Sequence, residues 1–212
     1  MAKCYDQYCP VAHALDLVGE RWSLLVVREL LQHGPLRYSD LLAALDGCST
    51  NMLATRLKDL ERGGVVRRRK LPPPAASTVY ELTSYGRGLA PVLRELAHWG
   101  AQVMGPPTPE VELDDDWLDG ALKIAFPPTT EARVEFHIDG QVGSLVEGDV
   151  VVGPVERPDV VVTGDATGFY RLVVERDLDA VEVTGSRTAL RALLAALPEQ
   201  VARTAADPGL AA

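Results

Sequence analysis

The sequence contains little of what marks disulfide-rich, secreted or membrane proteins. Its three cysteines, Cys4, Cys9 and Cys48, are too few and too unevenly spaced for a disulfide framework, and thiols in a reducing compartment are expected. No stretch approaches the roughly 18 uninterrupted apolar residues that a membrane helix needs. The first ten residues, MAKCYDQYCP, lack the apolar segment of a signal peptide. These absences predict a cytoplasmic protein with no membrane partner.

The common catalytic motifs are also missing. The chain has no GxSxG elbow, no HExxH, no P-loop and no GxGxxG fingerprint. Its four histidines, His13, His33, His98 and His137, are scattered singly, and His137 falls on the polar face of a predicted strand. A lone histidine is more often structural than catalytic. We therefore expect no enzyme activity, no metal site and no cofactor.

The charge is divided unevenly along the chain. Residues 1–105 carry 13 Lys and Arg against 10 Asp and Glu, a net charge of +3, whereas residues 106–212 carry 8 against 20, a net charge of −12. The proline-rich segment GPPTP at 105–109 lies between these halves, and proline disfavours both helix and sheet. We predict a first domain at 1–105, a linker at 106–111 and a second domain at 112–212. A cationic first half suits phosphate contact although the whole chain is acidic.

The segment 36–70 has the residue order of a helix-turn-helix. A first short helix at about 39–45 is expected to end at Asp46-Gly47, because glycine accepts the left-handed conformation of a helix stop. Ser49 is a candidate N-cap for a second helix, in which Leu53, Leu57 and Leu60 form one apolar stripe. Two helices joined by a short turn containing glycine are typical of the helix-turn-helix.

The opposite side of this second helix is polar and cationic. A turn of 100° per residue places Asn51, Thr55, Lys58 and Arg62 there, without a carboxylate at the centre. Such a face suits a DNA groove. Two amphipathic helices also occur in ordinary protein cores, and that alternative is weakened by the basic segment that follows.

The basic segment is expected to form one arm of a hairpin, called the wing. Gly63-Gly64 ends the helix, residues 65–70 (VVRRRK) begin an extended run, and a proline-rich tip at 72–74 separates it from a second strand at 78–82. The predicted DNA-binding residues of the helix and the wing are Ser49, Thr50, Asn51, Thr55, Arg56, Lys58, Arg67, Arg68, Arg69 and Lys70.

Three further helices are expected around this segment. Pro10 opens a helix that ends near Val18, because proline is favoured at the first helical position. A second, rich in apolar residues, is predicted at 20–31, and a third at about 87–104. The third carries a wide apolar stripe, which can fold back on its own core or pair with the same helix of a second subunit. We favour the homodimer, because the stripe is wide for a small core.

The first half resembles the HxlR-type family of bacterial winged-helix transcription regulators. The resemblance covers about residues 5–103 and rests on Cys9-Pro10 and on the segments 17–31, 37–41, 53–61 and 82–89. It implies a homodimer that binds a double-stranded DNA operator through the second helix of the helix-turn-helix, with help from the wing. The tip PPPAA at 72–76 departs from the usual wing, which leaves the contacts of the tip open.

The second half is predicted to form an antiparallel sheet covered on one side by helices, so that the whole chain is α+β. Apolar and polar residues alternate at 132–138, Asp139-Gly140 is a turn signal, and short apolar runs follow at 142–146, 150–152 and 160–163. A helix near 169–173, capped by Asp165 or Thr167, a strand at 180–184 and a helix capped by Ser186 complete the pattern. The acidic run 114–116 reads as an ion site or, in our interpretation, as a helix start.

The segments 158–165, 169–172 and 181–185 resemble the sterol carrier protein 2 type domain, over about residues 112–200. This resemblance implies a lipid-binding fold with an apolar cavity, and hence a hydrophobic small molecule or lipid as effector. The candidate cavity residues are Phe136, Ile138, Phe169, Leu172 and Leu194. Two functions follow: a DNA-binding regulator that senses an apolar ligand, which we prefer, or a lipid carrier tethered to DNA-binding helices.

Cys9 offers a third route to regulation. Its place before Pro10 puts it at a helix N-terminus, where partial positive charge favours the thiolate. Some HxlR-type regulators use a cysteine at this position for redox sensing, which is what the resemblance implies, with Cys4 as a possible resolving partner. The alternative is that Cys9 only packs at the dimer base. Cys4, Cys9 and His13 also loosely imitate a metal site that lacks its fourth ligand.

Overall fold

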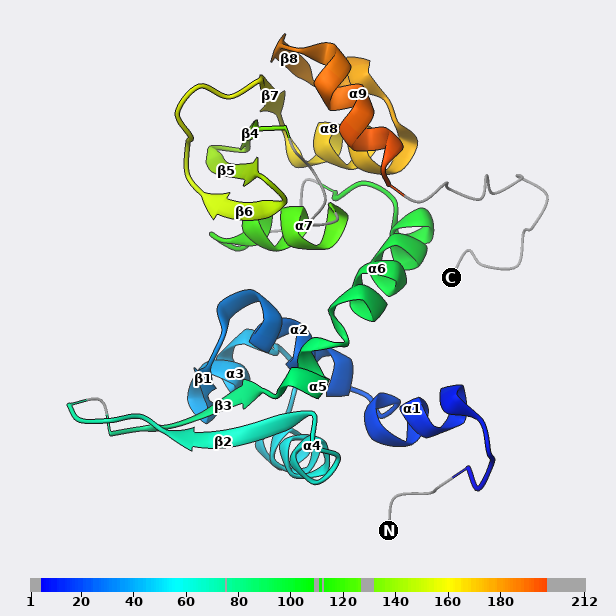
Figure 1. Ribbon diagram of the computed structural model, residues 1–212, viewed down its shortest axis with the longest axis vertical. Helices are drawn as coiled ribbons and strands as arrows, with labels where there is room; N and C mark the ends of the chain where they lie inside the picture. Colours follow the sequence, from blue (N-terminus) through cyan, green and yellow to red (C-terminus); the bar gives the residue numbers. More distant parts are fainter. Residues whose placement is uncertain (1–4, 75, 109–110, 112, 127–131, 198–212) are drawn as a thin grey trace. The chain divides into compact units, whose positions relative to one another are not determined.

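The computed structural model describes residues 5–74, 76–108, 111, 113–126 and 132–197. The chain forms two compact units, residues 1–93 and 94–212. Helix α6 (Ala90–Met104) begins in the first unit and continues in the second (Figure 1). Each unit combines helices with one sheet, as the α+β class requires. Within the described ranges, none of the helices is both long enough and apolar enough to cross a membrane.

The first unit is a helix-turn-helix followed by a hairpin wing (Figure 1). Its helices are α1 (Pro10–Val18), α2 (Ser23–His33), α3 (Tyr38–Ala44), α4 (Thr50–Arg62) and α5 (Ser84–Arg87). Its strands are β1 (Leu36–Arg37), β2 (Val66–Lys70) and β3 (Thr78–Leu82). They form a sheet in the order β1-β3-β2 with antiparallel neighbours, so β2 and β3 make the predicted wing.

The predicted apolar stripe of the second helix is confirmed as the core side of α4. Leu53, Leu57 and Leu60 are at most 2% exposed, and they belong to a cluster shared with Val26 and Leu41 from α2 and α3. A helix that buries one stripe turns its opposite side outward. The core therefore fixes which side of α4 is available for a partner.

Two predicted helix boundaries are wrong. The helix expected at 20–31 begins at Ser23, because Trp22 adopts a left-handed conformation with φ of 80° and ends the preceding turn. The helix expected at 87–104 is interrupted: Thr83 caps the short α5, the chain turns at Gly88, and α6 begins at Ala90. The apolar pattern continued through both places, and the spacing of apolar residues does not reveal a local turn in the backbone.

The second unit contains one five-stranded sheet and helices that pack on it (Figure 1). Its strands are β4 (Val134–Ile138), β5 (Gln141–Val146), β6 (Asp149–Val152), β7 (Val160–Gly164) and β8 (Glu182–Gly185). Its helices are α7 (Trp117–Ala125), α8 (Ala166–Tyr170), a π-helical turn η1 (Arg171–Glu175), a short 3-10 turn η2 (Leu178–Ala180) and α9 (Arg187–Ala195). Asp165 caps α8 and Ser186 caps α9, each by accepting a backbone N–H.

The prediction of a purely antiparallel sheet is wrong. The strand order is β6-β5-β4-β7-β8, and β4 and β7 pair in parallel. The segment 153–159 carries the chain back across the sheet, so β7 starts at the same end as β4. Alternation of apolar and polar residues identifies a strand but does not reveal the direction of its neighbour.

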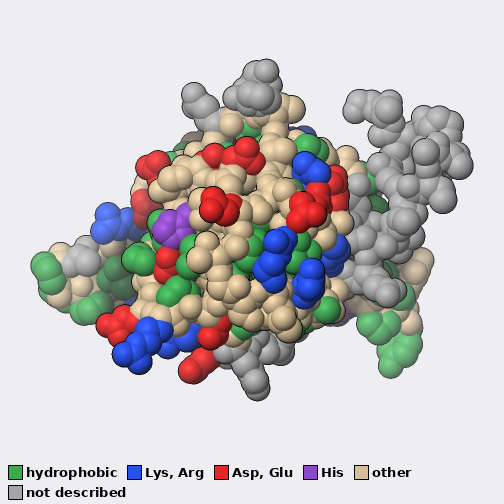
Figure 2. Space-filling model, turned by 90° about the horizontal axis from the view of Figure 1, so that it is seen from above, with side chains coloured by type: hydrophobic (Ala, Val, Ile, Leu, Met, Phe, Trp, Pro, Cys, Tyr) green, Lys and Arg blue, Asp and Glu red, His purple; other side chains and the backbone are tan. Residues whose placement is uncertain are grey.

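The two faces of this sheet differ in character. Val134, Phe136 and Ile138 of β4 are fully buried in one apolar cluster with residues of α7, α8 and α9. The other face carries Glu135 and Ser144, which are 7% and 0% exposed and bind the crossing segment 153–159. Figure 2 shows the side of the molecule that is seen from above relative to Figure 1, with acidic and basic side chains intermixed. On the side in view, the acidic side chains are therefore not gathered into one patch.

Candidate nucleic-acid interface

The N-terminus of α4 is held by a side-chain cap and by a tyrosine from α3. The Ser49 hydroxyl accepts the backbone N–H of Met52 at 3.3 Å, as predicted for an N-cap. The Tyr38 hydroxyl donates to the Thr50 carbonyl at 2.6 Å. Cys48, next to the cap, is 8% exposed and belongs to the core cluster. These contacts anchor the first turn of α4, so the helix presents a fixed end.

The outward side of α4 holds most of the helix residues predicted to bind DNA. Thr50, Asn51, Thr55 and Lys58 are exposed, and the Thr55 hydroxyl donates to the Asn51 carbonyl at 2.8 Å. Within the described part of the chain, Lys58 makes no ion pair, which leaves its ammonium group available. Met52, which is 41% exposed, also lies on this side and was missed because sequence reasoning looked only for polar side chains.

A shallow groove of about 290 Å³ separates α4 from the wing. It is lined by Tyr38, Ala54, Lys58, Glu61, Arg68 and Tyr80. Two tyrosine rings, two cations and one carboxylate therefore meet between the helix and the hairpin. Sequence reasoning found Lys58 and Arg68 but missed Ala54 and Glu61 of α4, Tyr38 of α3 and Tyr80 of β3, because only the packing of α4 against the wing brings these side chains to one groove.

Arg56, which was predicted to bind DNA, lies beside the outward side of α4 and not on it, so its contact with DNA stays a prediction that its placement does not favour. Its side chain is only 13% exposed and lies 3.5 Å from a carboxylate oxygen of Glu20 and 3.4 Å from one of Asp59. Arg56 is three residues after Leu53 and four before Leu60, so helical spacing places it beside the buried stripe. It ties α4 to the turn before α2 instead of facing solvent.

The four wing cations lie on two faces of the hairpin, because side chains alternate along a strand. The register pairs Arg68 with Tyr80 and Lys70 with Thr78, on the face that continues the groove beside α4. There the Arg68 Nε donates to the Glu61 carboxylate at 2.9 Å. This hydrogen bond and the Glu61 charge raise the pKa of Arg68 above its ordinary value. Arg68 is thus already paired within the protein.

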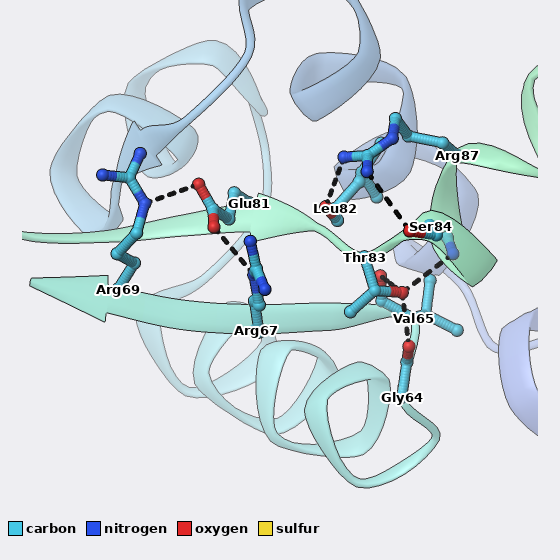
Figure 3. Close-up of polar contacts among 10 residues, drawn as sticks. Gly64, Val65, Arg67, Arg69, Glu81, Leu82, Thr83, Ser84 and Arg87 are labelled. Atoms are coloured by element: carbon cyan, nitrogen blue, oxygen red, sulfur yellow. Dashed lines mark hydrogen bonds and ion pairs between the residues drawn. The ribbon is translucent and has the colours of Figure 1, made fainter.

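The opposite face of the wing carries Arg67, Arg69 and the carboxylate of Glu81 (Figure 3). The Arg67 Nε donates to Glu81 Oε1 at 2.7 Å, and the Arg69 Nε donates to Glu81 Oε2 at 2.8 Å. The hydrogen bonds from Arg69 and then from Arg67 hold the pKa of Glu81 below its usual 4.5, although partial burial opposes them. Sequence reasoning treated the basic run as unpaired and missed both Glu61 and Glu81.

The base of the wing is fastened by Thr83 and Arg87 (Figure 3). The Thr83 hydroxyl donates to the Gly64 carbonyl at 2.6 Å and accepts the Gly86 N–H at 3.0 Å. The Arg87 guanidinium donates to the Leu82 carbonyl at 2.9 Å. These bonds fix the strands where they leave the core, so the arginines project from a defined base.

The structure places the candidate sensor Cys9 at the N-cap of α1, with intermediate exposure and a free thiol. Cys4 lies outside the described residues. Among the residues that the structure describes, no group of three or more His, Cys, Asp and Glu side chains is arranged to hold a metal ion.

The five candidate cavity residues all lie in the core of the second unit. Phe136, Ile138, Phe169, Leu172 and Leu194 are at most 4% exposed and belong to one cluster. Phe136 packs edge-on against Phe169, with ring centroids 5.9 Å apart. The structure therefore brings these side chains together as packed apolar core.

Two helices carry apolar side chains that neither core covers. Val11 and Leu15 of α1 are 67% and 45% exposed. Leu93 of α6 and the preceding Leu89 pack against the first core, but four residues along another side of the helix are exposed. These four, the α6 stripe, are Val92, Leu96, Trp99 and Val103, between 44% and 69% exposed. Apolar stripes of this kind mark interaction surfaces.

Known proteins match the first half of the chain. The model of the HxlR-like helix-turn-helix family matches residues 17–107. The uncharacterized HTH-type transcriptional regulator YvaP of Bacillus subtilis is 39% identical over 102 residues, which are 48% of this chain and 94% of YvaP. The HTH-type transcriptional regulator YodB of the same species is 35% identical over 46% of this chain and 88% of its own. A solved structure of reduced YodB is 34% identical and covers 48% of this chain and all of that chain, with a TM-score of 0.41.

Proposed function

Because the chain belongs to the HxlR-like helix-turn-helix family of DNA-binding transcriptional regulators, we propose that it acts as a homodimer on an inverted-repeat operator in the cytoplasm. In this proposal α4 enters the major groove and the wing contacts the neighbouring backbone. The single observation that carries it is the outward side of α4, a capped helix on which Lys58 makes no ion pair with any described residue. We propose binding, and not catalysis, as the activity of the whole chain.

The homodimer is supported by the α6 stripe. Val92, Leu96, Trp99 and Val103 follow the spacing i, i+4, i+7 and i+11, which keeps them along one side of a helix. Two copies of such a helix can cover each other about a two-fold axis. A two-fold protein presents two copies of α4 to one side of the duplex, about 34 Å or a multiple apart, which is why the operator is expected to be an inverted repeat.

The proposal is tested by selecting duplexes from a random pool with the full chain and then measuring variants on the enriched duplex and on a non-cognate duplex. Lys58→Ala is expected to weaken binding of the enriched duplex by about 1–3 kcal/mol and the non-cognate duplex less, because Lys58 faces the bases. Arg67→Ala is expected to weaken both similarly and to reduce the salt slope by about 0.9, the value for one phosphate contact.

Arg187→Ala serves as the matched control, since it removes one exposed arginine from the second unit. Failure of the wild-type chain to enrich any sequence would refute the proposed function. If Arg67→Ala left both the affinity and the salt slope unchanged, the wing contact alone would be wrong.

We further propose that a hydrophobic small molecule or lipid, bound by a second unit of sterol carrier protein 2 type, modulates DNA binding. This is supported by the resemblance of the segments 158–165, 169–172 and 181–185 to that type of domain, and a ligand would have to enter the packed apolar side of the sheet. Palmitate serves as the probe: it is expected to raise the melting temperature of the chain and to change its affinity for the enriched duplex. Vesicle lipid transfer in the absence of specific DNA binding would favour the alternative, a carrier tethered to DNA-binding helices.

A second candidate for regulation is oxidation of Cys9. The observation in its favour is a free, partly exposed thiol at the N-terminus of α1. Diamide is expected to change DNA binding by the wild-type chain and to leave the Cys9→Ser variant unaffected. A diamide response that persists in the serine variant would eliminate this role.

A further inference from the structure

We propose that Glu81 is a positioning residue for DNA binding, which holds Arg67 and Arg69 as a preformed clamp for backbone phosphate. The inference rests on the proposed DNA-binding function and adds a residue to its interface. A carboxylate in a phosphate-binding surface ordinarily weakens binding, because it repels the ligand and neutralises a cation. The geometry at Glu81 points to the opposite effect.

The carboxylate of Glu81 is shared symmetrically between the two arginines. Oε1 accepts the Nε–H of Arg67 and Oε2 accepts the Nε–H of Arg69, at 2.7 and 2.8 Å. The strand register enforces this, since Glu81 pairs directly with Arg67 and is diagonal to Arg69. The Glu81 side chain is 12% exposed, whereas those of Arg67 and Arg69 are 64% and 43% exposed. The carboxylate of Glu81 is therefore mostly covered, while the two guanidinium groups remain accessible to solvent.

Each arginine donates only one of its five N–H groups, the Nε–H, to Glu81. The terminal amino groups supply four donors per side chain in a planar fork, the arrangement that phosphate accepts bidentately. Figure 3 shows the terminal nitrogens of Arg69 on the far side of its guanidinium from Glu81. A contact through Nε therefore fixes the direction of the fork without occupying its end.

The charge of this face stays positive after the pairing. Arg37 lies on the same face, because it pairs with Val79 and Val79 pairs with Arg69. Its Nε donates to the Ser77 hydroxyl at 3.2 Å, which again leaves the terminal amino groups unused by that bond. Three guanidinium groups against one carboxylate give a net charge of +2. The face thus attracts phosphate while Glu81 limits the rotamers of two long side chains before binding.

Glu61 of α4, which binds a wing arginine, provides a contrast. Its side chain is 34% exposed, and among the described residues it binds a single arginine, Arg68, so this pair neutralises one cation and bridges no second one. Glu61→Gln and Glu81→Gln each remove one negative charge beside a wing arginine. If carboxylates acted only through their charge, both variants would bind DNA more tightly and with a steeper salt dependence.

The experiment compares these variants on a duplex enriched from a random pool by the wild-type chain and on a non-cognate duplex. Glu61→Gln is expected to bind both duplexes more tightly than the wild type, because it removes a carboxylate from the groove and leaves Arg68 unpaired. Glu81→Gln is expected to bind the enriched duplex about three- to tenfold more weakly, because the side chains of Arg67 and Arg69 would then lose conformational freedom on binding. Glu81→Asp, which keeps the charge but is too short to bridge both arginines, is expected to lose a similar factor.

A triple variant separates positioning from folding. In an Arg67→Ala, Arg69→Ala background, Glu81→Gln is expected to cause no further loss of affinity, because the clamp is already absent, and removal of the unpaired charge should if anything tighten binding. An equal loss in that background, accompanied by a lower melting temperature, would assign Glu81 a purely structural role and overturn the inference. Tighter binding by Glu81→Gln would overturn it as well. Absence of any enriched sequence with the wild-type chain would instead remove the proposed function itself.

Discussion

Glu135 is a nearly buried carboxylate that connects the second sheet to the segment crossing it. One oxygen is 2.6 Å from the His137 Nε2, and the other accepts the backbone N–H of Val155 at 2.9 Å. The hydrogen bond with His137 and then the one from Val155 hold the pKa of Glu135 below its ordinary 4.5, although burial opposes them. The ionised form is therefore the one that the folded state stabilises.

Glu135→Gln is expected to lower the free energy of unfolding by about 1–3 kcal/mol at neutral pH, the range for a hydrogen bond to a charged group. Because the folded pKa lies below the unfolded one, this contribution is complete above about pH 4.5 and is lost as the pH falls through the folded value. Urea unfolding between pH 7 and pH 3.5 measures it. Glu156→Gln, an exposed carboxylate in the same crossing segment, is the control and should stay close to the wild type. A difference that widens with acidification would contradict this account.

The positions of some side chains could be predicted from helical spacing alone, whereas the partners of others depend on how the elements pair and pack. Helical spacing was sufficient for the outward position of Lys58, and the same spacing, applied fully, would have placed Arg56 beside the buried stripe. Glu61 and Glu81 could not be assigned to partners from the sequence. The pairing of Glu81 depends on which residues of β2 and β3 face each other, and hence on the length and path of the wing tip, whereas that of Glu61 depends on how α4 packs against β2.

For helices and strands, the sequence predicted caps and turns that depend on a few neighbouring residues, but it did not predict features that depend on packing between distant segments. The sequence identified the helix caps Ser49 and Ser186, because serine is favoured at the N-cap. It also identified the turn at Asp139-Gly140, because Asp-Gly favours the positive φ that both residues adopt there. The break between α5 and α6 was hidden, because Leu89 and Val92 continue one apolar pattern across it. The parallel partner of β4 was equally hidden, since it is fixed by the path of segment 153–159.

Two glycines in helices provide a prediction at this level. A Cβ on Gly86 of α5 would lie 2.1 Å from the Val65 carbonyl oxygen, a contact with backbone that cannot easily move. Gly86→Ala is therefore expected to destabilise the chain by about 1–3 kcal/mol, as overpacking does. Gly100 of α6 has no atom within 4 Å of such a Cβ, so Gly100→Ala is expected to stabilise by up to about 1 kcal/mol. Thermal unfolding distinguishes them, and a loss of stability in both would contradict the packing argument.

The proposed homodimer is expected to dissociate when a charge is placed in the α6 stripe. Trp99 is 69% exposed, and Trp99→Glu would place two carboxylates in the proposed contact between copies of α6. Sedimentation should show a dimer for the wild type and a monomer for this variant, and footprints should shrink from two half-sites to one. Val152→Glu, an equally exposed apolar residue on the edge strand β6, is the control and should remain dimeric. A wild-type monomer at saturation would contradict the role of the stripe.

The parallel pairing of β4 with β7 also bears on the order in which the chain acquires its structure. The pair joins residues 26 positions apart, such as Val134 and Val160, and it can form only after the crossing segment has closed. In the first unit, the wing hairpin joins residues only 8 to 16 positions apart, whereas β1 pairs with β3 across 42 and 44 positions. Local pairings form faster than distant ones, and the N-terminal part also leaves the ribosome first. The wing hairpin and α4 are thus expected to form while the second sheet is still being synthesised, so the proposed DNA-binding surface of a nascent chain precedes the proposed effector unit.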